Sequence, residues 1–198
     1  MFNIVVIGPP CSGKGTQSKR IAKEYQLSHI SSGILFRKEI NKKTPLGFTL
    51  KKYIDKGLLV PDEIVLKKMY KAALSLRKSR GVVFDGFPRT LYQAQTMDKS
   101  LKKKAIQIAI AVFIDVGEQE LVKRLLRRSE DSERSDDSLE VIKKRIEVYK
   151  AETLPLIKYY SDKKKLITVS GMAHVETVCA RIINAINNFK KQNYTDGV

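Results

Sequence analysis

The sequence predicts an α/β protein in which helices cover both faces of a parallel sheet. Short, β-branched, apolar runs alternate with longer stretches whose apolar residues recur at helical spacing. A glycine-rich turn separates the first apolar run from the first helical stretch. Alternating strands and helices of this kind build parallel sheets, which bind ligands beyond the carboxyl ends of their strands.

The first part of the chain is expected to hold two strands and several short helices. In order, these are a strand over 3–7, a helix over 14–25, a short strand and turn over 27–32, and short helices over 33–60. A boundary follows at Pro61, and Asp62 is the expected N-cap of a helix that runs through Leu76.

The second part of the chain continues the alternation. Its expected elements are a strand over 81–85, a helix over 90–98, a strand over 108–114, a helix over 118–128, a strand over 166–170 and a helix over about 174–189. The wholly polar residues 129–137 predict an exposed loop. One long helix is expected from about Ser138 to Tyr160, bent near Pro155.

Length and composition fit one domain without a membrane anchor. The chain has 198 residues, of which 42% are hydrophobic, enough for a core. The longest apolar run, 108–114, is far shorter than the roughly 20 residues that span a bilayer. The amino terminus lacks the basic start and the long apolar middle of a signal peptide. We therefore expect a soluble, cytoplasmic protein.

The charge of the chain is strongly unbalanced. Lys and Arg number 38 against 21 Asp and Glu, which gives a formal net charge of +17. Such an excess is typical of nucleic-acid-binding proteins. The basic residues are scattered in pairs and triplets, however, and few have aromatic neighbours spaced for base stacking. This distribution favours a solvated lysine-rich surface, and a nucleotide-dependent nucleic-acid-binding protein is the weaker alternative.

The turn after the first strand has the spacing of a phosphate-binding loop. Gly8 and Gly13 are separated by four residues, and Lys14 follows directly. Glycines let backbone N–H groups approach an anion, and the next helix adds its positive amino-terminal end. The usual hydroxyl residue is displaced by one position, to Thr16. The motif predicts nucleotide binding, with Lys14 reaching the outer phosphates.

Residues 8–17 (G-P-P-C-S-G-K-G-T-Q) resemble the phosphate loop of nucleoside monophosphate kinases, and of adenylate kinases in particular. Five further segments match that family in order, over nearly the whole chain: 29–37, 57–63, 85–93, 124–145 and 170–173. Two residues depart from the family pattern. Cys11 stands where the family usually has Gly, and Ile34 where it usually has Asp.

The resemblance implies two nucleotide sites. The residues implied for ATP are Pro10, Cys11, Ser12, Gly13, Lys14, Gly15, Thr16, Arg124, Arg128 and Ala173. Those implied for AMP are Ser32, Arg37, Leu58, Leu59, Val60, Gly86, Phe87, Pro88, Arg89, Gln93, Arg134 and Arg145. In the resemblance Arg37 holds the phosphate of AMP, and Gln93 reads adenine with its amide, which can donate and accept at once.

The resemblance also implies the catalytic groups and the metal. Five cations are implied as catalytic: Lys14, Arg89, Arg128, Arg134 and Arg145. No general base is expected, because the acceptor phosphate is already largely ionised near neutral pH. Mg²⁺ would accompany ATP, held through water by Asp85. The resemblance is to the short-lid form, and Cys11 and Cys179 cannot build a zinc cluster, so no zinc is expected.

The domain organisation that follows is a single unit with two small closing segments. The core would span 1–30, 61–126 and 138–198, the monophosphate-binding segment 31–60 and the lid 127–137. The expected activity is reversible phosphoryl transfer from MgATP to AMP, which gives two ADP, by a monomer. A UMP/CMP kinase of the same fold is the nearer alternative, although Ser32, Asp62, Thr90 and Gln93 favour AMP.

Overall fold

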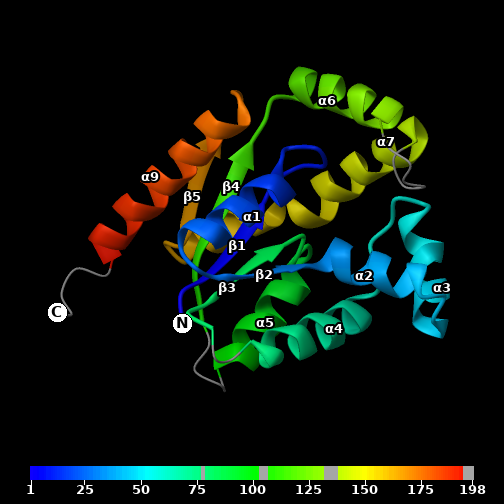
Figure 1. Cartoon of the computed structure of the whole chain (residues 1–198), viewed down its shortest axis with the longest axis horizontal. Coiled ribbons are helices and arrows are strands. Elements are labelled where there is room, and N and C mark those ends of the chain that lie inside the picture. Colours follow the sequence, from blue (N-terminus) through cyan, green and yellow to red (C-terminus); the bar gives the residue numbers. More distant parts are fainter. Residues whose placement is uncertain (77–78, 103–106, 132–137, 194–198) are drawn as a thin grey trace.

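The computed structural model describes residues 1–76, 79–102, 107–131 and 138–193 (Figure 1). The strands are β1 (Asn3–Ile7), β2 (Ser28–Ser31), β3 (Val82–Asp85), β4 (Ile108–Asp115) and β5 (Leu166–Ser170). The helices are α1 (Lys14–Glu24), α2 (Ser32–Asn41), α3 (Pro45–Ile54), α4 (Asp62–Ser75), α5 (Leu91–Lys102), α6 (Glu118–Asp131), α7 (Leu139–Val148), the π-helix η1 (Tyr149–Thr153), α8 (Pro155–Asp162) and α9 (Val175–Asn193).

The described strands form one parallel sheet in the order β2-β3-β1-β4-β5. The predicted α/β class and parallel sheet are confirmed. Strand β1 lies between β3 and β4. The chain leaves β1 towards β2 at one edge of the sheet, but it leaves β4 towards β5 at the other edge, so the direction of the connections changes between β1 and β4. Parallel sheets bind ligands in the crevice beside such a switch point, at the carboxyl ends of the strands. The phosphate loop follows β1 at that place.

Helices cover both faces of the sheet, so its strands are apolar on both sides. Val5 and Phe84 lie in a core shared with α4, α5 and α8, whereas their neighbours Ile4 and Val83 face α1 and α9. Figure 1 shows α1 and α9 on one side of the sheet and α4 and α5 on the other. Because both faces of the sheet are buried, its strands hold the loops at their carboxyl ends in fixed positions.

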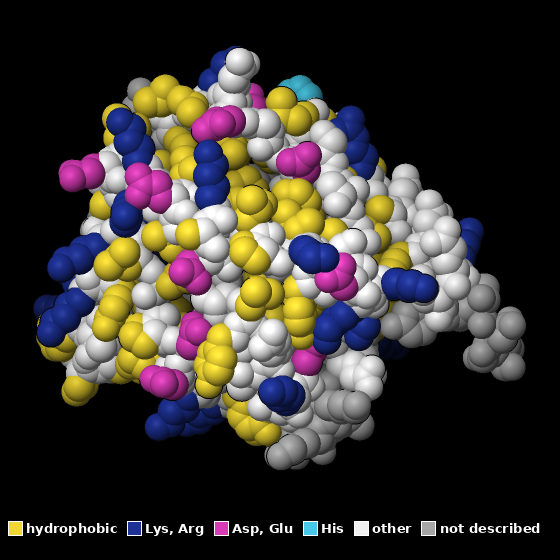
Figure 2. All heavy atoms as spheres, turned by 180° about the vertical axis from the view of Figure 1, so that it is seen from behind, with side chains coloured by type: hydrophobic (Ala, Val, Ile, Leu, Met, Phe, Trp, Pro, Cys, Tyr) yellow, Lys and Arg dark blue, Asp and Glu magenta, His cyan; other side chains and the backbone are white. Residues whose placement is uncertain are grey.

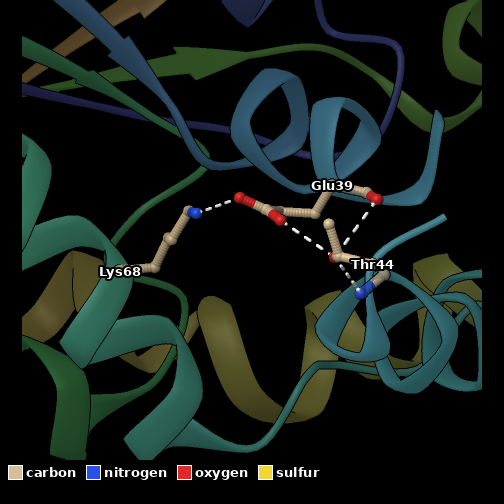
Figure 3. A network of polar contacts seen from close by, with 4 residues as sticks. Glu39, Thr44 and Lys68 are labelled. Atoms are coloured by element: carbon tan, nitrogen blue, oxygen red, sulfur yellow. Dashed lines mark hydrogen bonds and ion pairs between the residues drawn. The ribbon is translucent and has the colours of Figure 1, made fainter. Parts of the chain in front are cut away.

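Helices α2 and α3 extend from this base as a small arm (Figure 1). Glu39 of α2 accepts hydrogen bonds from Lys68 of α4 and from Thr44, whose side chain caps α3 (Figure 3). These contacts hold the pKa of the Glu39 carboxyl below its usual value, with Lys68 as the larger cause. One carboxylate therefore joins the two helices of the arm to the core helix α4.

Two local predictions are wrong, and a third is incomplete. The chain from 139 to 162 stays helical, as the αR backbone angles of Tyr149 and Leu154 show, but the π-helix η1 interrupts it between α7 and α8, directly before Pro155. Residues 129–131 belong to α6 instead of a loop, whereas 132–137 lie outside the described residues. Asp62 is the first residue of α4 and not its N-cap, a position that Pro61 takes.

None of the helices in the described part of the chain is both long and apolar enough to cross a membrane.

Candidate active site

The phosphate loop joins β1 to α1 in a left-handed turn. Gly13 precedes α1 with φ 88° and makes no side-chain cap, so the first N–H groups of the helix stay available for an anion. Cys11 also has a positive φ, 61°. That backbone region costs a side-chain-bearing residue about 1–2 kcal/mol and suits glycine. Cys11 therefore occupies a position whose backbone conformation suits glycine, the residue that the resemblance led us to expect there.

Lys14 begins α1 and folds back over the loop. Its Nζ donates a hydrogen bond to the carbonyl of Pro9 at 2.6 Å. Burial and the charge of Arg89 lower the pKa of Lys14 from 10.5 to about 7, although Asp85 acts in the opposite direction. An anion bound there would favour the charged ammonium group and so offset both the burial and the repulsion from Arg89.

Asp85 ends β3 beside the phosphate loop. Its Oδ2 lies 3.8 Å from Nε2 of His29, a residue of the neighbouring strand β2. Burial raises the pKa of the Asp85 carboxyl, but His29, Lys14 and Ser31 together outweigh burial and leave the pKa below its usual value. Asp85 is therefore held as a carboxylate at the carboxyl end of the sheet.

A large cavity opens over this loop and has a volume of about 1130 Å³. Asp85 is the only acidic side chain among its described lining residues, whereas basic groups come from several elements. The basic lining residues are Lys14, Lys19, Arg20, Arg37, Lys38, Lys42, Arg89, Arg124, Arg128 and Arg145. A cavity with this lining is suited to a polyanion.

A smaller pocket of about 70 Å³ lies under the α2–α3 arm. It is lined by Ser32, Gly33, Phe36, Arg37, Ile54, Gly57, Leu58, Leu59, Val60, Val65, Gly86, Arg89, Gln93 and Arg145. Ser32 Oγ donates to the carbonyl of Gly86 at 2.7 Å. Gly86 has φ 69°, and a Cβ there would lie 2.8 Å from Ser32 Oγ, so only glycine allows this close approach.

Three arginines, Arg37, Arg89 and Arg145, line both the pocket and the large cavity. Arg89 and Arg145, together with Lys14, also line a third space of about 50 Å³. Arg89 Nε donates to the carbonyl of Gly86 at 2.9 Å, and its own carbonyl accepts from Thr153 Oγ1 of η1 at 2.9 Å. The π-helix therefore contacts the backbone of a site residue, a placement common for such turns.

Arg124 and Arg128 of α6 line the large cavity as well. Arg124 pairs with Glu120 at 2.8 Å and donates to the carbonyl of Gly171 at 2.9 Å. Arg128 Nη1 lies 3.7 Å from the Cys11 sulfur, so it reaches the phosphate loop. Their spacing of four residues does place them on one side of the helix, as the sequence predicts.

Most of the predicted site residues come together around these spaces, but a few do not line them. Phe87 is buried in the core at 3% exposure, and the Ser12 side chain is buried within the loop. Ala173 packs against the core beside Gly171. Arg134 lies outside the described residues. Ile34 lines the large cavity with a side chain that is 47% exposed.

Sequence reasoning missed several residues of the site. Lys19, Lys38 and Lys42 line the large cavity, but a lysine-rich sequence gives no signal that separates them from other lysines. Asp62 was expected to cap a helix and, with Thr90 and Gln93, to favour AMP; the structure shows that it contacts both of these residues, which sequence reasoning did not predict. The spacing of Thr90 and Gln93 is that of a capping box, which could have indicated a hydrogen-bonded turn there.

A parallel sheet, a glycine-rich loop before α1 and cations shared by two cavities define a P-loop phosphotransferase of the nucleoside monophosphate kinase class. The adenylate kinase family model matches residues 6–165. The chain is 45% identical to an adenylate kinase of Parabacteroides distasonis, over 96% of this chain and all of the relative. It is 43% identical to one of Phocaeicola vulgatus, over 94% and 98% of the two chains, and 40% identical to one of Porphyromonas gingivalis, over 96% and 98%.

The chain belongs to the adenylate kinase family. This finding confirms the resemblance and the predicted enzyme class, a kinase that transfers a phosphoryl group between ATP and AMP. On the face that Figure 2 shows, acidic and apolar side chains are interspersed with the basic ones.

Proposed function

We propose that ATP binds in the large cavity over the phosphate loop and AMP in the pocket under the α2–α3 arm, with transfer between them. The observation that carries this assignment is the position of Arg37, Arg89 and Arg145, which line both spaces. Arg89 and Arg145 also line a third space with Lys14, so a phosphoryl group transferred between the two nucleotides would move beside these two side chains. The products of transfer to AMP are two molecules of ADP.

The chemistry that these residues supply is positioning and charge stabilisation. Two polyanions must be brought end to end, and the moving group spreads negative charge over its oxygens. Arginine offers planar, permanently charged, bidentate contacts, so Arg89, Arg128 and Arg145 suit this task. Lys14 would hold the outer donor phosphates against the helix end, and Arg37 the phosphate of AMP.

Asp85 fits the role of the residue that holds Mg²⁺ through water. Mg²⁺ retains several waters and is bound by one or two carboxylates together with substrate phosphates. Asp85 is ionised, lies beside the phosphate loop and lines the large cavity. The bound ion would neutralise part of the donor phosphate charge. Among the described residues, no cluster of three or more His, Cys, Asp or Glu side chains suggests a site for another metal.

Two segments would close over the nucleotides: 31–60, which includes the α2–α3 arm, and 127–137. Closure would exclude water and strengthen each charge contact. Arg134 would then reach the phosphates from the second segment.

The cytoplasmic location and the monomeric state stay predictions, which cell fractionation and gel filtration would test.

A phosphotransfer assay with an acceptor panel tests the proposed function. The purified protein is given MgATP with AMP, UMP or CMP, and nucleoside diphosphates are measured. We expect ADP from AMP at a rate far above those of the pyrimidine nucleotides. A faster rate with UMP or CMP would assign the chain to the pyrimidine kinases of this fold.

A further inference from the structure

The side-chain amide of Gln93 is held at both ends by other protein groups. Its Nε2 donates a hydrogen bond to Asp62 Oδ1 at 2.7 Å, and its Oε1 accepts one from the backbone N–H of Arg89 at 2.7 Å. Asp62 is held in turn by Thr90, whose Oγ1 donates to Oδ2 at 3.0 Å. Gln93 is 1% exposed and lines the pocket under the α2–α3 arm.

These partners permit one orientation of the amide. A carboxylate can only accept hydrogen bonds, and a backbone N–H can only donate. Rotation of the amide by 180° would set its oxygen against the Asp62 carboxylate and its NH₂ group against the Arg89 N–H. Both contacts would be repulsive in a buried place, where an unmet hydrogen-bonding group is costly.

A locked amide presents the remaining two hydrogen-bonding positions in a fixed order. One N–H of Gln93 and one lone pair of its oxygen are left for a ligand. Adenine offers the complementary pair on its Watson–Crick edge, an acceptor at N1 and a donor at N6. Hypoxanthine has the same size and shape, but it carries a donor at N1 and an acceptor at O6. A freely rotating glutamine could match either base, whereas the locked one matches only adenine.

We propose that Asp62 is a specificity-determining positioning residue, which fixes the Gln93 amide so that the acceptor pocket takes 6-aminopurine and rejects 6-oxopurine nucleotides. The inference rests on the proposed function, because it places AMP in the pocket that Gln93 lines. Asp62 acts through Gln93 and touches no reacting atom. A purely structural role, as one member of a hydrogen-bonded helix start, is the competing account.

The test compares AMP with IMP in the wild type, in Asp62→Asn and in Glu63→Gln. An asparagine at 62 can turn either its oxygen or its NH₂ group towards Gln93, so the amide is no longer locked. Glu63 is the matched control, because it lies next to Asp62 in the first turn of α4, is exposed, and undergoes the same change from carboxylate to amide. The measurements are kcat and KM for AMP and IMP at saturating MgATP, and KM for ATP.

We expect the ratio of kcat/KM for AMP to that for IMP to fall at least about tenfold in Asp62→Asn, mainly through KM. The KM for ATP should stay at its wild-type value, and Glu63→Gln should match the wild type throughout. A wild-type ratio in Asp62→Asn would overturn the proposal, and so would an equal loss for AMP, IMP and ATP. Absence of AMP activity in the wild type would instead refute the proposed function.

A second variant keeps the test open should Asp62→Asn fail to fold. Thr90→Val removes the hydroxyl that holds Asp62 Oδ2 and accepts the Gln93 backbone N–H at 3.1 Å, and Thr90→Ser is its conservative counterpart. We expect the AMP-to-IMP ratio to fall in Thr90→Val and to recover in Thr90→Ser. An unchanged ratio in a folded Thr90→Val variant would overturn the proposal.

Discussion

The two nucleotide spaces are built on different principles. The pocket under the α2–α3 arm is about 70 Å³ and is shaped by hydrogen bonds between protein groups: Ser32 donates to Gly86, and Gln93 donates to Asp62. The cavity over the phosphate loop is about 1130 Å³ and is distinguished by its positive charge. The first space is suited to select a base, and the second to attract and hold phosphates.

This difference arises because the base and the phosphates of a nucleotide are recognised in different ways. A base is recognised by the order of its donors and acceptors, so the groups that read it must be fixed in advance. Phosphates are recognised by charge, which acts over several ångströms and tolerates loose geometry before closure. Variants that affect one space and not the other therefore test the comparison.

The largest expected effect belongs to Lys14, on the phosphate side. Lys14→Ala removes the ammonium group at the start of α1, and we expect kcat to fall about 10²- to 10³-fold, the usual loss for a preorganised charge contact. Lys23→Ala, an exposed change at the other end of the same helix, serves as the control. Steady-state kinetics decides the matter, and a wild-type rate in Lys14→Ala would show that the phosphates lie elsewhere.

Arg89 lines both spaces, so its removal should affect both nucleotides. We expect Arg89→Ala to lower kcat by about 10²-fold and to raise KM for both ATP and AMP. Arg89→Lys keeps the charge and loses the planar fork, so an intermediate loss is expected. If the KM for only one nucleotide rises, Arg89 belongs to one space alone and the proposed transfer path is incorrect.

Alkylation of Cys11 should affect the cavity over the phosphate loop and leave the pocket under the α2–α3 arm unchanged. Iodoacetamide would add a bulky group to the wall of the large cavity, so we expect ATP binding and activity to fall at least tenfold while AMP binding persists. Cys11→Gly should resist the reagent, whereas Cys179→Ser should be inactivated like the wild type. Calorimetric titration of the labelled protein with each nucleotide gives the answer. Full labelling without loss of ATP binding would contradict the expectation.

The pKa of Lys14 predicts that a proton is taken up when ATP binds in the cavity over the phosphate loop. With a pKa of about 7 in the empty site, Lys14 is largely neutral at pH 8 and largely charged at pH 6. Bound phosphates favour the charged form, so ATP binding at pH 8 should take up a proton at Lys14, approaching one per molecule. Calorimetry in two buffers of different ionisation enthalpy measures this number. The Lys14→Ala variant should lose the uptake, and an unchanged value there would refute the assignment.

The smallest expected effect lies in the α2–α3 arm. Glu39→Gln weakens the contacts to Lys68 and Thr44, and we expect a slight fall in melting temperature at pH 7 (Figure 3). The folded-state pKa of Glu39 is lowered, so its stabilisation is present above the ordinary carboxyl pKa and fades as pH falls through the folded value. The difference between variant and wild type should therefore shrink at pH 3. Glu24→Gln, an exposed change on α1, should show no such dependence.

Much of the site was predictable because its signals are local. Gly8, Gly13 and Lys14 are contiguous with a strand and a helix, so the sequence alone indicates a phosphate loop there. Asp62 illustrates the opposite case. Its place before a helix suggested a cap, and only the resemblance grouped it with Thr90 and Gln93. These partners lie 28 and 31 residues away, so no short-range pattern shows that the three side chains are in contact. For the irregular region between α7 and α8, Pro155 was the one signal in the sequence. It did not predict the π-helix, whose Thr153 contacts the backbone of Arg89, a residue far away in the chain.

The sequence by itself determined the α/β class, the phosphate loop and the order of the site segments, because strand period, helix period and glycine turns are properties of neighbouring residues. The tertiary structure alone decided which cations face both spaces, how the Gln93 amide is turned and which lysines line the large cavity. Those outcomes depend on contacts between residues far apart in the chain, whose geometry is set when the helices pack on the sheet.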